Sequence, residues 1–412
     1  MRKLFAFMVS SCLLAVQSLT AQTLSIDSCY AMATRNFPLI KQYDLIEKSK
    51  EFTLSNAGKA YLPQVSLTAI EGYVFGGLPG GDGGKLQFIG IAQVNQTIWD
   101  GGATKTQKNI IQASAAVDKA AIDVSLHDLR ARVNQLYFGI LVIDEQQKQL
   151  DVQSAVLKNN LNKAKQLLDN GLAYKTDVDE IRVEQLKIDQ KKTEFIYARS
   201  GYMSMLSYLI GTPLTAQTNL QKPLAAYSLE DTQIIRPELS LYKSQRNLVN
   251  ALAEVQKVNM MPKLGLLGAG IMLAPGTSLG PDKISSIGVA GLSASWNISG
   301  LYKNSNEKQL SKLQLDKINV QEETFLFNTN FQLKQSSANI EKQKAILADD
   351  HEIVKLLQTV REGYQVKYES GVGTMIDLLN ATEKEADARA QRALHEIQLL
   401  MTLYDFKTIS GN

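Results

Sequence analysis

The sequence predicts a mixed α/β protein in which long antiparallel helical hairpins carry pairs of β-strands. Three observations lead to this prediction. Landmark residues recur at a nearly constant offset, apolar residues recur at every seventh position over many turns, and two regions alternate apolar with polar residues. The first observation indicates an internal duplication, the second indicates coiled-coil helices, and the third indicates strands.

The duplication is carried by five pairs of landmarks that keep the same order along the chain. Their offsets lie between 197 and 200 residues, and the pairs are Pro38/Pro237, Pro63/Pro262, Trp99/Trp296, Gly171/Gly371 and Asp177/Asp377. We therefore predict a first structural repeat over 22–211, a linker over 212–234 and a second structural repeat over 235–412.

Residues 1–21 have the composition of a signal peptide. Arg2 and Lys3 precede a short apolar core, and Ala21 offers a small residue for cleavage. Cys12 lies inside that core rather than at its end, which argues against a lipid anchor. Removal of this segment leaves 42 of the 44 basic residues against 41 acidic ones, so net charge provides no attraction for nucleic acid.

The rest of the chain offers no helical route through a membrane. After residue 21, no apolar run approaches the roughly 20 residues of a membrane-spanning helix. Cys29 is the only cysteine in this part, so it has no partner for an intramolecular disulfide. If this exported protein enters a membrane, it must do so by β-strands.

Two β-hairpins are predicted, at 63–99 and 262–298, each around a loop rich in glycine and proline, at 76–84 and 274–281. The run KLQFIGIAQVNQTIW places Phe88, Gly90, Ala92, Val94 and Ile98 on one face and Gln87, Gln93, Asn95 and Thr97 on the other. Four strands are too few to close even the smallest bacterial barrels, of about eight strands. In a membrane, the barrel would therefore have to be shared between chains, because an open edge leaves backbone groups unsatisfied there.

Long helices follow each predicted β-hairpin, at 102–168 and 302–368. In the first of them, an apolar residue recurs every seven positions at Leu129, Leu136, Ile143, Leu150, Leu157 and Ala164. About 66 residues of helix reach about 100 Å. Glycine turns then lead into return helices, at 177–210 and 376–409, that are half as long. The short helices that open each repeat, at 37–59 and 238–259, are expected to cover the remaining apolar surface.

Several motifs match a known family in the order and spacing described above. They are NFP and RPE at the helix openings, LPQVSL and MPKLGL before the strands, IWDGG at the strand-to-helix junction, and GVGTMIDLLNAT at the second hairpin. With the duplicated plan, they make the chain resemble the TolC-like outer-membrane efflux protein family from about Leu24 to Ser410. GVGTMIDLLNAT is the most specific of these motifs.

The resemblance implies a homotrimer in the outer membrane, with a transmembrane β-barrel of about twelve strands, four from each chain. Coiled-coil hairpins would continue the barrel into a periplasmic tunnel. Such a protein is the exit duct of a tripartite efflux pump or of type I secretion. Its partners would be outer-membrane lipid, a periplasmic adaptor protein and an inner-membrane transporter of the RND, ABC or MFS class. The resemblance implies no cofactor and no enzymatic reaction.

The resemblance also assigns roles to individual residues. Asp377 matches the first acidic position of the periplasmic gate, whereas the second is Asn380, so one of two carboxylate rings is expected to be missing. Lys175, beside Asp177, is the only nearby substitute for the basic residue of an ion pair between hairpins. The expected adaptor-docking tips are Gly171, Leu172, Gly371, Val372 and Gly373. Trp99 and Trp296 are candidate membrane-boundary residues.

Simpler interpretations compete with these roles. Asp177 and Asp377 also suit the positive end of a helix dipole and nothing more. His127, His351 and His395 lack metal-ligand spacing, and GGLPGGDGG lies between strands rather than before a helix, so the sequence points to no metal site and no enzyme. An exported coiled-coil rod or adhesin would explain the heptads but not the paired strands. A periplasmic adaptor would need a lipoyl-like domain interrupted by one hairpin, which the sequence does not contain.

Overall fold

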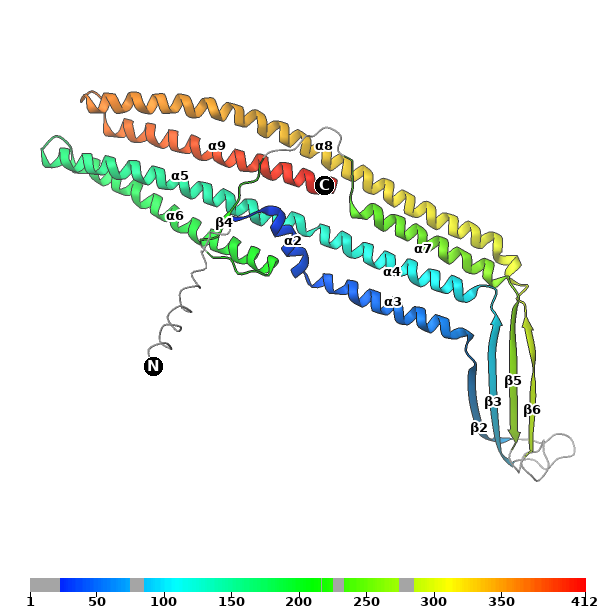
Figure 1. The fold of residues 1–412 in the computed structure, drawn as a ribbon. Helices are drawn as coiled ribbons and strands as arrows, with labels where there is room; N and C mark the ends of the chain where they lie inside the picture. The colour runs from blue at the N-terminus through cyan, green and yellow to red at the C-terminus, as the bar shows by residue number, and fades with distance from the viewer. Residues whose placement is uncertain (1–22, 75–84, 216, 225–232, 274–284) are drawn as a thin grey trace, which may run out of the picture. The chain divides into compact units, whose positions relative to one another are not determined.

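The computed structural model describes residues 23–74, 85–215, 217–224, 233–273 and 285–412 (Figure 1). The predicted signal peptide and the two predicted loops between strands lie outside the described residues. The predicted combination of long helices with a few strands is confirmed. Among the described helices, none has both the length and the apolar character that crossing a membrane requires.

The chain forms two compact units. Unit 1 comprises residues 1–40, 125–236 and 327–412, and unit 2 comprises residues 41–124 and 237–326. Each unit contains parts of both predicted repeats, so the compact units do not coincide with the repeats. In unit 2 the reason is visible in the sheet, where a strand of the first repeat pairs with a strand of the second.

Unit 2 is built on a four-stranded antiparallel sheet in the order β2-β3-β5-β6 (Figure 1). Its strands are β2 (Gln64–Val74), β3 (Lys85–Trp99), β5 (Lys263–Leu273) and β6 (Ser285–Ser295). A helix adjoins each strand in sequence: α3 (Gln42–Gly58) with the 3₁₀ turn η2 (Lys59–Tyr61), α4 (Ala103–His127), α7 (Pro237–Asn259) and α8 (Gly300–Glu369).

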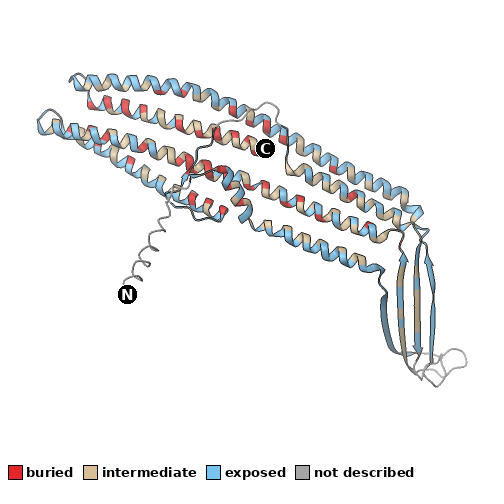
Figure 2. Ribbon diagram, viewed as in Figure 1, coloured by how far each residue is buried: buried red, intermediate tan, exposed pale blue. Residues whose placement is uncertain are grey.

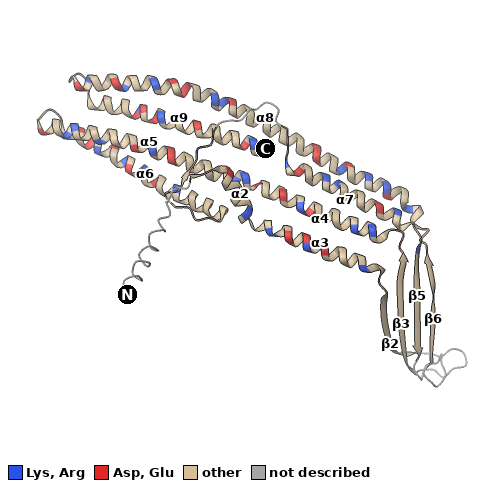
Figure 3. Ribbon diagram, viewed as in Figure 1, with Lys and Arg blue, Asp and Glu red and all other residues tan. Residues whose placement is uncertain are grey.

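The register of the sheet separates its two faces by polarity in β2 and β3, whereas β5 and β6 carry apolar residues on both faces. Leu67, Ala92, Gly270 and Gly288 form one cross-strand row, whereas the next row, on the opposite face, begins with Ser66 and Gln93. This is the alternation that the sequence predicted for β3. Charge is nearly absent from the four strands, in which Glu71, Lys85 and Lys263 are the only Asp, Glu, Lys or Arg residues (Figure 3).

A β-bulge near the end of β3 changes the face on which Trp99 lies. Thr97 pairs with Gly265 and Trp99 pairs with Leu264, so Ile98 is an extra residue on this strand. Without the bulge, Trp99 would share the face of Thr97 and Gln93. With it, Trp99 lies on the face of Val94, because a one-residue shift moves a side chain to the other side of the sheet.

The junction between β3 and α4 is fixed by the carboxylate of Asp100, which is buried. It accepts hydrogen bonds from the backbone N–H groups of Gly102 (2.8 Å) and Thr104 (2.6 Å) and from the Tyr61 hydroxyl (2.9 Å). Burial alone raises the pKa of Asp100, but these hydrogen bonds outweigh it and lower the pKa to about 2. Gly101 has a φ of +66°, and a Cβ there would lie 2.5 Å from Met261 Cβ.

In its described residues, unit 1 is helical apart from one short ladder. It contains the C-terminal part of α8 and the elements β1 (Thr23–Leu24), α2 (Ile26–Asn36), α5 (Leu129–Asp169), α6 (Lys175–Ile210), β4 (Asn219–Leu220) and α9 (Met375–Ser410). The 3₁₀ turn η1 (Pro38–Lys41) follows α2. Helix α5 packs against both α6 and α9, and α9 packs against α8, which orders the long helices as α6-α5-α9-α8.

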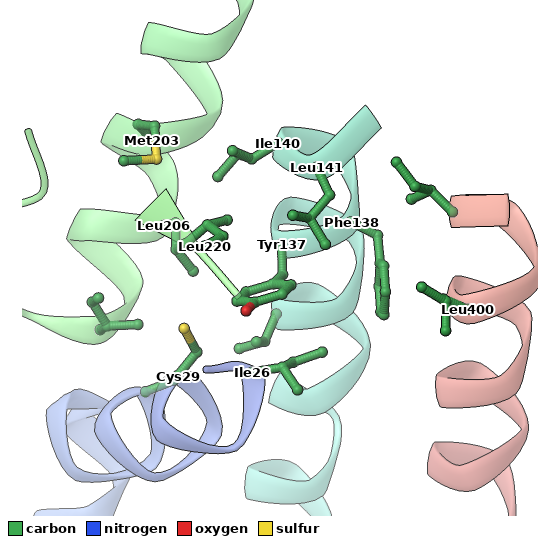
Figure 4. Close-up of a cluster of buried hydrophobic side chains, with 14 residues drawn as sticks. Ile26, Cys29, Tyr137, Phe138, Ile140, Leu141, Met203, Leu206, Leu220 and Leu400 are labelled. Atoms are coloured by element: carbon green, nitrogen blue, oxygen red, sulfur yellow. The ribbon is translucent and has the colours of Figure 1, made fainter. Parts of the chain in front are cut away.

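The main core lies in unit 1 where α2, α5, α6 and α9 meet (Figures 2 and 4). Tyr137 and Phe138 of α5 are fully buried there, beside Cys29 of α2 and Leu206 of α6. The Tyr137 hydroxyl lies 2.7 Å from the carbonyl oxygens of both Leu24 and Gln221, which ties the β1–β4 ladder to the core. Burial raises the pKa of the Cys29 thiol to about 12, so this cysteine is unreactive.

Two features of the elements differ from the sequence expectation. The first long helix, predicted as one element over 102–168, is divided at Asp128 between α4 and α5. Asp128 keeps right-handed helical angles (φ −62°, ψ −20°), so the interruption is local. The parallel β1–β4 ladder, with β4 in the predicted linker, was not expected, because two-residue strands are too short to show a period.

We predict that Asp100→Ala destabilises the first turn of α4, because three hydrogen-bond donors lose their acceptor. Loss of such a cap costs about 1–2 kcal/mol. The N–H groups of Gly102 and Thr104 should exchange hydrogen faster by mass spectrometry on the full chain. In the wild type, the cap is complete above the ordinary pKa of 3.8 and weakens as the pH falls toward about 2, since the folded-state pKa is lowered.

Asn297, at the corresponding junction after β6, provides the matched control. Its side chain accepts a hydrogen bond from the Ser299 hydroxyl (2.6 Å). Asn297→Ala should therefore change exchange at the start of α8 less than Asp100→Ala changes it at the start of α4. Equal effects of the two variants would contradict the capping role of Asp100.

Candidate functional site

The two helical tips of unit 1 have the same backbone design. Helix α5 ends at a turn in which Leu172 N donates to Leu167 O (2.7 Å), and α8 ends at a turn in which Val372 N donates to Lys367 O (3.0 Å). Each bond spans five residues and closes the helix end around a glycine with positive φ, +71° at Gly171 and +77° at Gly371.

The residues that follow these glycines project from the tips. Leu172 is 75% exposed and Val372 is 82% exposed, and Tyr174 is similarly open to solvent. Gly373 packs tightly, since a Cβ there would lie 3.0 Å from Lys367 Cβ. The tips therefore present apolar side chains on rigid turns, which is a suitable surface for another protein.

Asp177 and Asp377 occupy the same position, in the first turn of the helix that follows each tip. The Asp177 carboxylate accepts from Tyr174 N (3.1 Å). The Asp377 N–H donates to the Thr374 hydroxyl oxygen (3.2 Å) and the Asp377 carboxylate accepts from Thr374 N (3.4 Å), which forms a capping box. The same carboxylate also accepts from the Thr374 hydroxyl (2.6 Å). Both acids thus stabilise a helix start, and any second role uses the remaining oxygen of each carboxylate.

An apolar cluster joins the two hairpins near their tips. It combines buried residues of three helices: Leu150, Leu157 and Ala164 of α5, Ile181 and Ile188 of α6, and Met375 and Leu378 of α9. Tyr364 and Tyr368 of α8 pack against the same cluster. Leu378 is 1% exposed, so the contact between hairpins includes fully desolvated surface.

Polar contacts also link the hairpins. Lys163 Nζ of α5 lies 3.1 Å from Glu369 Oε1 of α8. A hydrogen bond from Gln365 and this lysine lower the pKa of Glu369 below its ordinary value. Burial, and to a smaller extent the charge of the Asp177 carboxylate, raise the pKa of Tyr368. The ion pair is largely exposed and therefore contributes little to stability.

A groove of about 470 Å³ lies between α6 and α9, with α5 at its floor. Its apolar lining is formed by Leu157, Val183, Ile376 and Leu379. Four acids surround it, namely Asp179, Glu180, Glu184 and Glu383, and Asn380 also lines it. The groove is therefore acidic around an apolar floor, and it lies next to the helix starts that carry Asp177 and Asp377.

The interface between α8 and α9 contains ionic contacts. Glu385 is 7% exposed and pairs with both Arg361 and Arg389. Farther from the tip, His395 Nδ1 lies 2.6 Å from Asp350 Oδ2. The described residues include no group of three or more side chains of the kinds that bind metal ions.

The chain is similar to known proteins in its fold but matches none of the compared families or curated proteins by sequence. No protein-family profile matches the chain, and no curated protein matches it by sequence. The outer-membrane channel OprN matches the structure with a TM-score of 0.69 at 14% identity, over 94% of this chain and 89% of that chain. VceC, an outer membrane protein of Vibrio cholerae, gives 0.67 at 12% identity over 94% and 96%. The open-state outer membrane channel MtrE of Neisseria gonorrhoeae gives 0.64 at 13% over 94% and 89%.

The chain has the fold of the TolC-like outer-membrane efflux channels. This confirms the predicted resemblance at the level of the fold. In this TolC-like fold, the glycines and apolar residues predicted for the tips do lie on the two turns. Lys175 and Asp177 lie in the first turn of α6, and Asp377 and Asn380 lie at the start of α9.

Trp99 and Trp296 lie at the same, helix-proximal end of the sheet in this TolC-like fold. Trp99 ends β3, and Trp296 immediately follows β6 and donates its indole N–H to Met260 O (2.9 Å). Leu292 and Ala294 of β6 share the face that the bulge gives to Trp99, and Trp296 lies just beyond the paired residues of this strand. Both rings are partly exposed.

Two features of the site were not anticipated from the sequence. An ion pair between the two hairpins, Lys163 with Glu369, was not predicted from the sequence. These residues are 206 positions apart, so no local signal connects them. Asp100 was quoted only within the motif IWDGG, although an aspartate before two glycines and a helix is itself a capping signal.

We predict that the apolar cluster, and not the ion pair, holds the two tips together. Leu378→Ala removes a buried side chain and should destabilise the tips by about 2–4 kcal/mol. Hydrogen exchange across 160–185 and 365–385 of the full chain would rise in both segments. Lys163→Met should leave both segments nearly unchanged, because exposed ion pairs contribute little.

Ile376→Ala is the matched control for that experiment, because Ile376 lies in the same turn but is 49% exposed. Its effect should stay within about 0.5 kcal/mol. A larger effect from Lys163→Met than from Leu378→Ala would overturn the assignment and make the tip contact electrostatic.

Proposed function

We propose that this chain is the subunit of an outer-membrane channel, the exit duct of a tripartite efflux pump or of type I secretion. The observation that carries the proposal is the four-stranded sheet of unit 2. Its apolar strands are nearly free of charge, and each edge strand has a hydrogen-bonded neighbour on one side only within the described residues. Such a sheet suits a membrane only when further strands complete it.

The dimensions of the strands support a membrane location. The segment Leu264–Leu273 of β5 has ten residues and no charge. At a tilt near 45°, ten residues span roughly 25 Å, the height of the apolar band of bacterial barrels. Trp99 and Trp296 bound this band at its helix-proximal end, where amphipathic rings favour the membrane–water interface.

Closure of the barrel requires several copies of the chain. Three copies would supply about twelve strands, enough for a closed barrel, whereas in a single sheet the outer edges of β2 and β6 have no neighbouring strand among the described residues. We therefore propose a homotrimer in the outer membrane that passes small molecules or polypeptides to the exterior. No cofactor is needed for this function.

The tips are the proposed contact with the periplasmic adaptor and its inner-membrane RND, ABC or MFS transporter. Leu172 and Val372 offer exposed apolar side chains on turns fixed by Gly171, Gly371 and Gly373. The acidic groove between α6 and α9 lies beside them, so a partner helix with apolar and basic side chains would fit this end of unit 1.

Asp377 is the proposed ion-selective residue of the periplasmic entrance. Its carboxylate is exposed and uses one of its two oxygens, Oδ2, for the hydrogen bond at the start of α9. Three copies around an axis would therefore form a ring of carboxylates that favours cations. Asn380 supplies no second ring. Asp177 is less exposed and lies beside Tyr368, and Lys175 next to it offsets its charge.

Electron microscopy of the mature protein, extracted in mild detergent from the outer-membrane fraction, tests the assembly and its location. We expect a hollow particle of three-fold symmetry, because three copies are needed to close the sheet. Absence from that fraction, or a solid rod without a pore, would end the channel proposal and leave an exported coiled-coil protein.

We predict that Asp377→Asn lowers the cation selectivity of the channel in planar bilayers. The amide oxygen still accepts a hydrogen bond at the start of α9, so the helix keeps its cap while the ring loses its charge. Asp177→Asn is the matched control, since it makes the same chemical change at the equivalent turn, and we expect a smaller shift in reversal potential. Negligible and equal effects would remove Asp377 from the gate.

A further inference from the structure

The four junctions between strands and helices in unit 2 carry an excess of basic residues. They contain six lysines but only two acidic residues. One acid, Asp100, is buried as the cap of α4, and the other, Glu254, pairs with Lys257 (2.5 Å). The whole chain has a formal net charge of only +3, so this excess is local. The junctions are the segments 56–64, 99–108, 254–263 and 296–305.

Four of these lysines lie on helices and are exposed, and Figure 3 shows basic residues at the sheet-side ends of these helices. Each lies two or three residues from the helix end that adjoins the sheet, which corresponds to about 3–5 Å of helix rise. The four lysines therefore occupy a layer no thicker than one lipid headgroup region, roughly 5–8 Å. This lysine belt is defined as Lys59, Lys105, Lys257 and Lys303.

The stability of the helices does not explain the lysine belt. Lys59 and Lys257 lie in the last turns of their helices, where a cation complements the helix dipole. Helices α4 and α8 instead start at the sheet, where the dipole favours acids. Neither has an acidic residue in its first turn, and each has a lysine there, Lys105 or Lys303. Positive charge thus follows the position beside the sheet rather than the direction of the helix.

The opposite pattern holds at the tips of unit 1, where helices also start. Both α6 and α9 have an aspartate in the first turn, Asp177 or Asp377, as the dipole favours. The chain therefore uses acids at helix starts away from the sheet and lysines at helix starts beside it. This contrast indicates that a ligand outside the chain favours positive charge beside the sheet.

Aromatic and apolar side chains adjoin the lysine belt. Trp99 and Trp296 lie at this end of the sheet, and Tyr302, next to Lys303, is 82% exposed. Further apolar residues at the junctions, each more than 40% exposed, are Leu62, Met261 and Leu301. Apolar strands, then amphipathic rings, then long basic side chains is the order of groups that suits a bilayer surface from its hydrocarbon to its headgroups.

We infer that the lysine belt binds the phosphate groups of anionic phospholipids in the leaflet that faces the helices. Basic residues beside a membrane surface favour anionic lipids. Lys59, Lys105 and Lys303 form no ion pair within the described residues, so their charges remain for a ligand. The ligand is a lipid rather than an acidic protein because the belt directly follows the apolar strands and the two tryptophans. This inference rests on the proposed function, in which those strands cross the outer membrane.

Lys263 lies at the same end of the sheet but on its other face, which makes it the matched control. It pairs with Ser295, and its neighbour Leu264 pairs with Trp99. Successive residues of a strand point to opposite faces, so Lys263 shares the face of Gln93 and not that of Trp99. In the proposed channel this is the face turned away from lipid.

Quenching of tryptophan fluorescence by brominated lipids tests the inference on the full mature chain. Trp99 and Trp296 are the only tryptophans and adjoin the belt. The protein is placed in bilayers of equal parts phosphatidylglycerol and phosphatidylcholine, with bromine on one lipid or the other. We expect phosphatidylglycerol to be preferred by at least about fivefold, the factor for one lysine beside an anionic surface. Added salt should weaken this preference.

Three variants separate the belt from other sources of the preference. Lys59→Gln, Lys105→Gln, Lys257→Gln and Lys303→Gln in one chain should bring the relative affinity close to one, whereas arginine at the same four positions should keep the preference. Lys263→Gln should keep it as well. A preference that persists in the glutamine variant, or that disappears in Lys263→Gln, would overturn the inference. Equal quenching of the wild type by both lipids would also overturn it, and is the result expected if the belt binds an acidic protein.

The same experiment distinguishes failure of the belt from failure of the channel. If neither brominated lipid quenches the tryptophans, the sheet does not lie in the bilayer, and the proposed function fails together with the inference. If both lipids quench equally, the sheet lies in the bilayer, and only the assignment of the lysine belt is wrong.

Discussion

The need to satisfy backbone hydrogen bonds governs this structure. The antiparallel pairing of β3 with β5 joins strands that are far apart in the chain and makes one sheet from two hairpins. A hairpin alone would leave two open edges, and two hairpins joined in this way still leave two. The order of the helices in unit 2 follows from this pairing, because each helix continues from its own strand. A single backbone constraint thus fixes which helices are inner and which are outer.

The same constraint appears at the helix ends, where local side chains and glycines satisfy it. Both tips close with a backbone bond across five residues and a glycine of positive φ, and both following helices begin with an aspartate that accepts an N–H. At the junction after β3, Asp100 meets the same need with three donors. These capping bonds therefore fix the positions of Asp177 and Asp377 at the tips, whatever further role the two carboxylates have.

The sequence predicted the features that depend on local pattern. The tip turns, the capping acids and the two faces of β3 each follow from a few neighbouring residues. The bulge at Ile98 does not, because it exists only in the register with β5, and neither does the pairing of Lys163 with Glu369. The division of the chain into units could not be predicted either, since it depends on pairing between the two predicted repeats.

Both hairpins hold their helices together with apolar contacts and ion pairs, and this bears on how a channel of the proposed kind could open. Helices α5 and α6 share apolar residues such as Leu157, Ile181 and Ile188, whose separation would expose apolar surface to water. Between α8 and α9, Glu385 pairs with Arg361 and Asp350 pairs with His395, while Arg389 pairs with Glu385 within α9. Charged groups released together into water regain their hydration, so separating them costs less than their burial suggests. Separation of α8 from α9 would also expose the buried apolar cluster of Leu333, Ile340, Leu403 and Phe406, so neither hairpin opens without exposing apolar surface.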